Sequence, residues 1–180
     1  MILNQEAFLR VAAFGLSLGL LTLLEFLAPK RPKERGSPAR WAGNVANSFL
    51  NTLILRFVLP LVPVLAAASA AEREFGLFHI LPLPAPLALI LSILLLDLLI
   101  YFQHRVFHHV DLLWRLHRMH HTDPVMDAST ALRFHVIEIG LSLLIKVLAV
   151  FALGASPEAV ILFEIILNSA AMFNHANIAL

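Results

Sequence analysis

Several histidines of this chain stand at spacings that could bind metal ions. Nine histidines occur among 180 residues, and five of them form two short groups: His104 and His108, then His117, His120 and His121. On a helix, residues three or four positions apart share one face, so each group could direct its imidazoles at one point. Imidazole binds zinc, copper, iron and nickel. Five such histidines within 18 positions exceed what one structural metal needs, and they predict a polynuclear site or two neighbouring sites.

Other metal chemistries find little support. The chain has no cysteine, which excludes disulfides, thiolate metal sites and iron–sulfur clusters. Neither the His-Glu-x-x-His pattern of metalloproteases nor any Glu-x-x-His occurs, so a carboxylate-bridged di-iron site in a four-helix bundle is not supported. Two metals held by histidines are the simplest interpretation. Of the other histidines, His79 and His109 are expected to be ordinary surface or core residues, while spacing alone assigns no role to His135 and His175.

The elements that carry these histidines are expected to lie in lipid. Hydrophobic residues make up 59% of the chain and charged residues 14%, against about 45–50% and about 25% in a soluble domain. The mean hydropathy is +0.83. This composition argues against a soluble enzyme, and a net charge of +1 gives no field that would attract nucleic acid.

Five apolar runs are candidates for membrane-spanning helices, which need about 20 apolar residues. They cover residues 7–28, 45–70, 87–102, 136–153 and 159–173. Pro60 and Pro63 are expected to kink the second run, and residues 154–157 indicate a tight connection between the last two runs. The sequence therefore predicts an all-α protein, a multi-pass transmembrane helical bundle with a cytosolic histidine-rich cap. The last two runs could instead form a re-entrant pair.

Lysine and arginine set the expected orientation, because cytoplasmic loops carry an excess of both. The loop after the first run and the polar stretch after the third are basic, whereas only Arg10 and Arg73 fall on the other side. The basic residues are Lys30, Arg31, Lys33, Arg35 and Arg40, then Arg105, Arg115, Arg118 and Arg133. We therefore expect an integral membrane protein of a bacterial inner membrane, with residues 104–135 and His175 on the cytoplasmic side.

These residues and their flanks resemble the fatty acid hydroxylase and sterol desaturase superfamily of membrane di-iron enzymes. The resemblance runs from about residue 40 to the last residue. The matching segments are Arg40-Trp41-x2-Asn44, Asp97-x3-Tyr101-x2-His104-Arg105-x2-His108, Leu113-Trp114-x2-His117-x2-His120-His121, Thr130-Ala-Leu-Arg133-Phe-His135-x2-Glu138 and Phe173-Asn-His175-Ala-Asn177. Residues 1–43 are then an N-terminal transmembrane anchor with a basic loop, and residues 44–180 a hydroxylase-like membrane domain that is incomplete at its C-terminal end.

The resemblance implies two iron ions, with zinc as a substitute, held almost entirely by histidine. The implied ligands are His104, His108, His117, His120, His121 and His175, with His135 as a further candidate. Val136 stands where the family usually has a proline. Asp97 is expected either to accept a hydrogen bond from a ligand imidazole or to pair with Arg56 or Lys146. Glu138 is expected to orient His135 in the same way or to cap its helix.

The activity that the resemblance implies is the oxidation of an unactivated carbon–hydrogen bond in a lipid by dioxygen. The substrate would be a fatty acyl chain, a sterol or a carotenoid, and the product hydroxylated or desaturated. No G-x-G-x-x-G fingerprint occurs, so the electrons are expected from a separate donor such as cytochrome b5, ferredoxin or a reductase. Two alternatives stay open: a metal-binding membrane protein without catalysis, and a b-type cytochrome.

The family has a further His-x2-His-His box after its isolated histidine, and none follows His175 here. Six or seven imidazoles would leave two irons short of ligands. The sequence therefore predicts a truncated form with little oxygenase activity of its own.

The charge asymmetry predicts that both basic loops lie in the cytoplasm. A reporter fused after Arg40 and another fused after His121 should both register as cytosolic, because each follows a segment rich in lysine or arginine. Opposite locations for the two fusions would contradict this topology and would separate the histidines from the basic loop.

Overall fold

The computed structural model describes residues 2–31, 37–59, 62–81 and 83–179, with side chains from residue 5 onward. Within these residues the chain is helical, and β-structure is limited to an isolated bridge between Pro29 and Ile178. The predicted all-α fold is therefore confirmed. The helices are α1 (Ile2–Leu27), α2 (Pro38–Val58), α3 (Pro63–Glu72), α4 (Leu77–Ile80), α5 (Ala85–His109), α6 (Asp111–His121), the 3-10 helix η1 (Ala128–Leu132), α7 (Val136–Leu153) and α8 (Pro157–His175).

Prolines, serines and a glycine set the bounds of these helices. Proline occupies the first turn of α2, α3, α5 and α8, where its fixed φ suits a helix and its missing N–H is not needed. Ser37 and Ser156 cap α2 and α8 by accepting backbone N–H groups of the first turn. Gly154 ends α7 with a φ of 66°, the left-handed conformation common at helix ends. The predicted tight connection between the last two runs is confirmed.

Two predicted runs have different bounds in the structure. The run 45–70 is divided, because α2 ends at Val58 and α3 begins at Pro63. Pro63 thus starts a helix instead of kinking one, as expected for a residue that cannot continue the hydrogen-bond ladder; Pro60 lies outside the described residues. The third run continues beyond residue 102 to His109. His104 and His108 therefore stand on a membrane-length helix and not in a polar loop.

The described residues contain five stretches that are long and apolar enough to cross a membrane. These are Gln5–Leu27, Pro38–Ile80, Ala85–His109, Val136–Leu153 and Pro157–His175. Large apolar side chains such as Phe8, Phe57 and Ile80 are exposed on them, which marks a surface that faces lipid. The protein is therefore a multi-pass membrane protein, as its composition predicts.

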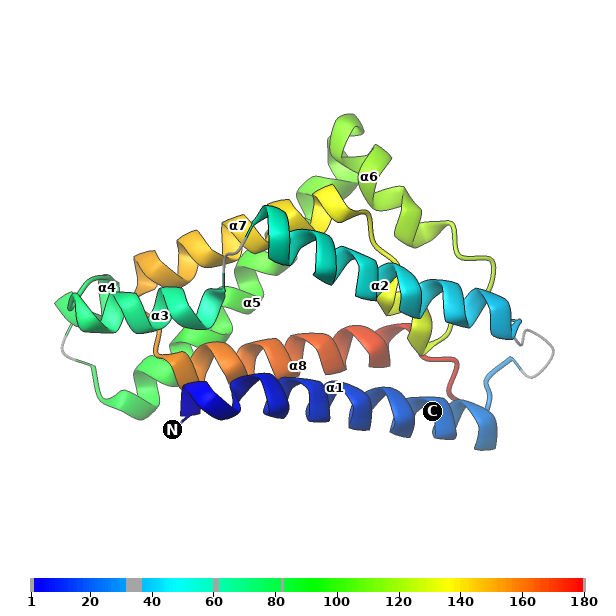
Figure 1. The fold of residues 1–180 in the computed structure, drawn as a ribbon, viewed down its shortest axis with the longest axis horizontal. Helices are drawn as coiled ribbons and strands as arrows, with labels where there is room; N and C mark the ends of the chain where they lie inside the picture. Colours follow the sequence, from blue (N-terminus) through cyan, green and yellow to red (C-terminus); the bar gives the residue numbers. More distant parts are fainter. Residues whose placement is uncertain (1, 32–36, 60–61, 82, 180) are drawn as a thin grey trace.

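Several connecting segments of the bundle lie together at one end, away from the α7–α8 turn (Figure 1). α1, α5 and α8 run toward this end, and α2 and α7 run away from it. The end consequently holds α6, η1 and the last turns of α5 and α8. Lys30, Arg31 and Arg40 lie there as well, while Lys33 and Arg35 lie outside the described residues. Lys30, Arg31 and Arg40 thus share one end with the histidine segments, as the predicted topology requires.

Two apolar clusters hold the bundle together. The larger joins α5, α7 and α8 through Leu96, Val150 and Phe163, and α3 also contributes to it. The smaller joins α1, η1 and α8 and includes Leu21 and Met172. Because of the second cluster, α1 packs against the elements nearest the histidines and is more than a separate anchor.

Charged residues inside the spans pair with one another. Glu164 on α8 is 2% exposed. Its Oε1 lies 2.5 Å from Nζ of Lys146 on α7, and its Oε2 lies 2.9 Å from Nη2 of Arg10 on α1. The Lys146 partner expected for Asp97 is therefore engaged elsewhere. These contacts satisfy charges that would be costly in hydrocarbon.

Removing Glu164 should destabilise the bundle more than removing the whole pair. The Glu164→Leu variant leaves the Lys146 ammonium without its counter-charge, which typically costs about 3–5 kcal/mol, whereas Arg10 keeps Glu6 as a partner. Adding Lys146→Met removes the stranded charge and should restore much of that loss. Thermal unfolding in detergent, followed by circular dichroism, measures both effects. Equal losses in the single and double variants would show that the two residues are not coupled.

Candidate metal centre

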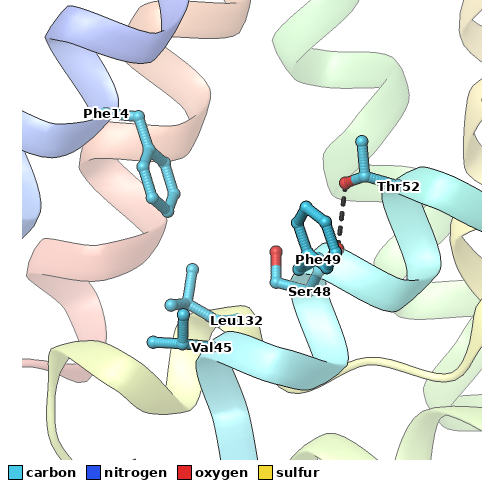
Figure 2. Close-up of a pocket in the computed structure, with 6 residues that line it drawn as sticks. All are labelled: Phe14, Val45, Ser48, Phe49, Thr52 and Leu132. Carbon is cyan, nitrogen blue, oxygen red and sulfur yellow. Dashed lines mark hydrogen bonds between the residues drawn. The ribbon is translucent and has the colours of Figure 1, made fainter. Parts of the chain in front are cut away.

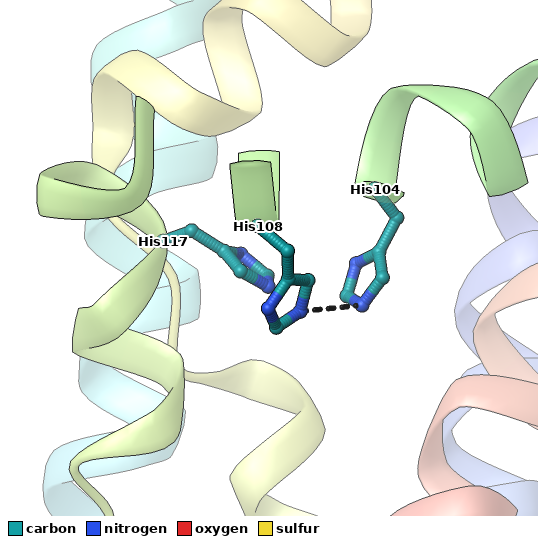
Figure 3. A group of neighbouring side chains, drawn as sticks. All are labelled: His104, His108 and His117. Carbon is teal, nitrogen blue, oxygen red and sulfur yellow. Dashed lines mark hydrogen bonds between the residues drawn. The ribbon is translucent and has the colours of Figure 1, made fainter. Parts of the chain in front are cut away.

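The histidine boxes meet because the chain changes direction after His109. Val110 adopts an extended conformation, with φ −100° and ψ 115°, and separates α5 from α6. Asp111 follows in the first turn of α6, where a negative charge is favourable. α6 remains in contact with the last turns of α5. As a result, the imidazoles of His104 and His108 on α5 lie next to that of His117 on α6 (Figure 3).

Four imidazoles form the first group, which we call the four-histidine group (His104, His108, His117 and His121). The Nε2 atoms of His104 and His108 are 3.1 Å apart, and those of His117 and His121 are 3.2 Å apart. One ring nitrogen from each of His104, His108 and His117 lies within 4.8 Å of the other two. The ring centroids of His108 and His121 are 4.8 Å apart. The four rings therefore converge on one small volume.

His120 and His175 form the second group, the His120–His175 pair. Their Nε2 atoms are 2.8 Å apart, although one residue lies on α6 and the other on α8. His120 points away from His121 because adjacent helix positions are about 100° apart. The rings of His117 and His120 stack with centroids 5.6 Å apart, so the two groups adjoin.

Two imidazoles of α6 are held in the neutral form. Burial, followed by the proximity of His175, lowers the pKa of His120 to about 3. Burial, followed by the proximity of His117, also lowers the pKa of His121. A neutral imidazole offers a nitrogen lone pair, which is the form that binds metal ions.

The donor set fits an ion that prefers imidazole. The paired Nε2 atoms are 2.8–3.2 Å apart, and each pair can share at most one proton, so at least one nitrogen of each pair carries a lone pair toward the other. Six imidazoles without a thiolate suit zinc, copper or iron.

Hydrogen bonds to the far ring nitrogens orient the central imidazoles. Nδ1 of His117 lies 2.6 Å from Oε1 of Glu138 on α7, and both residues are buried. Nδ1 of His175 donates to the carbonyl of Ala171 at 2.7 Å. Each bond places a proton on Nδ1 and leaves Nε2 for a metal. Glu138 therefore contacts His117, whereas the sequence indicates His135 as its partner.

Four other residues lie apart from both groups. His135 caps α7, and its Nδ1 accepts a backbone N–H of the first turn. Asp97 is exposed on α5, and no described hydrogen bond or ion pair joins it to a histidine. His109 binds the carbonyl of Arg105. His79 lies at the opposite end of the bundle, next to the end of α7.

Phe134 also belongs to the centre, although the sequence gives it no role beyond its place in the motif around His135. Its ring stacks on His120, with centroids 4.6 Å apart and an interplanar angle of 5°. Two asparagines of α2 hold its backbone: Asn47 accepts the N–H at 3.1 Å, and Asn51 donates to the carbonyl at 2.8 Å. With Asn44, these residues recur on one face of α2 at i, i+3 and i+7. That spacing is the signal that could have indicated a polar partner for this face.

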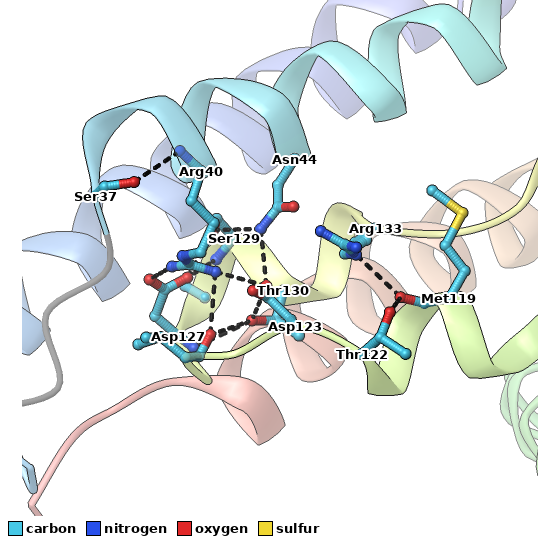
Figure 4. Close-up of polar contacts among 12 residues, drawn as sticks. Ser37, Arg40, Asn44, Met119, Thr122, Asp123, Asp127, Ser129, Thr130 and Arg133 are labelled. Atoms are coloured by element: carbon cyan, nitrogen blue, oxygen red, sulfur yellow. Dashed lines mark hydrogen bonds and ion pairs between the residues drawn. The ribbon is translucent and has the colours of Figure 1, made fainter.

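Arg40 fixes the loop between α6 and η1 to α2 (Figure 4). Its guanidinium binds Asp123 at 2.5 Å and also binds Asp127. Asn44 and Thr130 each donate a hydrogen bond to Asp123 at 2.9 Å. Burial by itself would raise the pKa of Asp123, but the hydrogen bonds from Arg40, Asn44 and Thr130 lower it. The sequence indicates Arg40 only as a loop charge and a motif residue, so its two acidic partners are a finding of the structure.

The Arg40–Asp123 contact predicts a specific sensitivity to acid. The pKa of Asp123 is depressed in the folded chain, so its carboxylate stabilises the fold above the usual aspartate pKa of about 3.9, and this contribution is lost as the pH falls below that value. The Asp123→Asn variant should be less stable than the wild type at neutral pH and should lose less stability on acidification to about pH 3. Thermal unfolding across this range measures the difference, with the exposed Asp111→Asn as control. Parallel curves for the wild type and Asp123→Asn would contradict the assignment.

Among the cavities of the described residues, two lie close to the loops at this end of the bundle. One, of about 240 Å³, separates α1 from α2 and is mainly apolar (Figure 2); it is lined by Phe14, Val45, Ser48, Phe49, Thr52 and Leu132. The other, of about 310 Å³, has His175 in its wall together with Lys30 and Arg31. Of these two cavities, the second combines a histidine of the cluster with cationic side chains.

Comparison with known proteins identifies the family of this chain. A family model described as fatty acid hydroxylase matches residues 89–180, just over half of the chain. No curated protein and no solved structure matches. The matched region runs from the first turns of α5 to the last residue and holds both histidine groups and Glu138. The chain therefore belongs to the fatty acid hydroxylase family.

Proposed function

We propose that this protein is a membrane-bound lipid oxygenase that binds two iron ions through its two histidine groups. The observation that carries the proposal is the convergence of six imidazoles from α5, α6 and α8 around the buried His117. Membership of the fatty acid hydroxylase family supports a lipid hydroxylase or desaturase. Iron at such a site supplies the activation of dioxygen and the oxidation of a carbon–hydrogen bond of the lipid.

The four-histidine group would hold one ion and the His120–His175 pair the other. Zinc is expected to bind the same nitrogens, since it also prefers imidazole. The pair supplies fewer imidazoles than the first group, so its ion should be held more weakly. We leave His135 out of this ligand set because its Nδ1 already caps α7.

The surrounding residues orient the ligands and control access to them. Glu138 holds the proton on Nδ1 of His117, and Phe134 covers one face of His120. Both contacts lie on the buried side of the cluster. By contrast, His104, His108 and His121 are exposed on the other side. The protein thus shields one side of the centre and leaves the other side open to a reactant.

We further propose that the lipid reaches the centre through the cavity that contains His175. Nε2 of His175 faces His120, so this cavity borders the His120–His175 pair. Lys30 and Arg31 line the same cavity and can attract an anionic head group, a carboxylate or a phosphate. The apolar chain of such a lipid would then extend along the adjoining helices.

The electrons would come from a separate protein, because the chain carries no dinucleotide fingerprint. Arg115 and Arg118 are exposed on α6 and offer positive charge to an acidic donor such as cytochrome b5 or ferredoxin. We assign this end of the bundle to the cytoplasmic side of the membrane, on the basis of its basic loops.

Replacing His120 and His121 by alanine should remove most of the bound metal. The double variant takes one imidazole from each histidine group, while the wild type should bind roughly two iron or zinc ions per chain. Elemental analysis of the purified protein measures the content. The matched control is His79→Ala with His109→Ala, which removes two imidazoles outside both groups and should bind metal like the wild type. Unchanged metal content in the first variant would refute the site.

Turnover tests the catalytic part of the proposal with the same variants. The protein is supplied with ferrous iron, dioxygen, a reducing partner and a fatty acyl, sterol or carotenoid lipid, and mass spectrometry detects an added oxygen or the loss of two hydrogens. Because the sequence predicts little oxygenase activity for this form, slow turnover is expected. A small amount of product from the wild type and the control, but none from the double variant, supports the oxygenase. Metal binding without product would favour a non-catalytic metal-binding protein, and a haem absorption band would favour a cytochrome.

A further inference from the structure

One carboxylate ties the end of α1 to two segments near the histidines. Oε1 of Glu25 accepts hydrogen bonds from the backbone N–H groups of Ala128 at 2.8 Å and Asn177 at 2.7 Å. These donors lie 103 and 152 positions further along the chain. Ala128 begins η1, and Asn177 follows α8. A single side chain therefore joins three separate elements.

Both donors are next to groups that form or support the His120–His175 pair. Asn177 comes two residues after His175. Ala128 begins the short helix that leads to Phe134, the ring that stacks on His120. The Glu25 carboxylate thus holds the backbone on both sides of the pair.

The segments after α1 and α8 form a short antiparallel clasp around this contact. Pro29 and Ile178 make the isolated bridge, and the N–H of Lys30 donates to the carbonyl of Asn177 at 3.2 Å. The Asn177 side chain accepts the N–H of Arg31 at 3.0 Å and donates to the Arg31 carbonyl at 3.2 Å. The clasp fixes the direction in which the chain leaves His175.

Other polar contacts of α1 lie further from the histidines. Ser17 and Ser169 approach within 2.9 Å through their hydroxyl groups, and Arg10 pairs with Glu164. Those contacts dock α1 along α8. Glu25 instead accepts hydrogen bonds from two backbone N–H groups for which no other acceptor is described. A backbone N–H group without an acceptor is costly when it is shielded from water.

We propose that Glu25 is a positioning residue for the His120–His175 pair. α1 is thereby a working part of the metal centre, although it lies outside the residues that match the family model. The inference rests on the proposed function, because it concerns the ligands of the second ion. Loss of the acceptor would release η1 and the segment after His175. The four-histidine group, which stands on α5 and α6 without a described contact to Glu25, would keep its geometry.

Cobalt(II) binding to the full chain in detergent tests this inference. Cobalt(II) is added stepwise to the metal-free protein. Visible absorption follows the binding of each ion, and competition with a chelator measures its affinity. The wild type should show a tight step and a weaker step, and Glu25→Leu should weaken only the second, by about 10- to 100-fold. Glu25→Gln keeps an acceptor oxygen and should behave like the wild type. Ser17→Ala, which removes a polar contact of α1 elsewhere, should do the same.

Combined variants show whether Glu25 acts through the pair. His175→Ala should abolish the weaker step, and adding Glu25→Leu should change nothing further, because both act on one ion. His108→Ala affects the tight step, so its effect and that of Glu25→Leu should add. These patterns distinguish positioning from a general loss of stability, which would weaken both steps together.

Three results would overturn the inference. The first is wild-type binding of both ions by Glu25→Leu, and the second is an equal loss of both steps in that variant. If Glu25→Leu does not fold, Glu25→Asp keeps the charge but withdraws the oxygen by one methylene, and it should show the same selective loss to a smaller degree. The third result that would overturn the inference is wild-type binding of both cobalt ions by Glu25→Asp. A wild-type protein that binds no cobalt would refute the proposed function itself, which is a separate and recognisable outcome.

Discussion

The hydrogen bond between Glu138 and His117 holds the centre of the histidine cluster. The ring of His117 lies 4.6–5.6 Å, between centroids, from those of His104, His108, His120 and His121. Because the Nδ1–H group donates to the carboxylate, Nε2 is directed toward the neighbouring imidazoles. The bond requires α7 to pass close beneath α6. On α7, Gly140 also allows a close approach to α2, since a Cβ there would lie 3.2 Å from Leu55.

Local periodicity predicted the part of this centre that lies on single helices. The pairs His104/His108 and His117/His121 are four positions apart, and in each pair the Nε2 atoms do meet. The same spacing rule identifies His120 as a candidate ligand. It does not predict the direction in which the His120 side chain points. It stands three positions after His117 and one before His121, so it projects to the other side of α6 and meets α8. Its partner His175 is 55 positions away, and spacing alone gave that residue no role.

The remaining contacts depend on how the helices cross, which periodicity does not encode. The sequence leaves two roles for Glu138, orienting His135 or capping its helix, yet in the structure the first turn of α7 directs this side chain at His117 on α6. Arg40 was counted as a loop charge, whereas it binds two aspartates more than 80 positions later. Composition and charge predicted the all-α membrane bundle and the shared end of its loops. They could not predict the division of the second span, because a proline can either kink a helix or begin one.

The clasp between the segments after α1 and α8 has a consequence for how the protein is made. α1 is synthesised and enters the membrane before the chain has reached Ala128 and Asn177, the donors that its Glu25 requires. Contacts between residues so distant in sequence form late in folding, because closing the intervening chain costs entropy. The second histidine group consequently takes its shape after the five spans have assembled. For the proposed metal centre, this order would delay binding of the second ion until the bundle is complete.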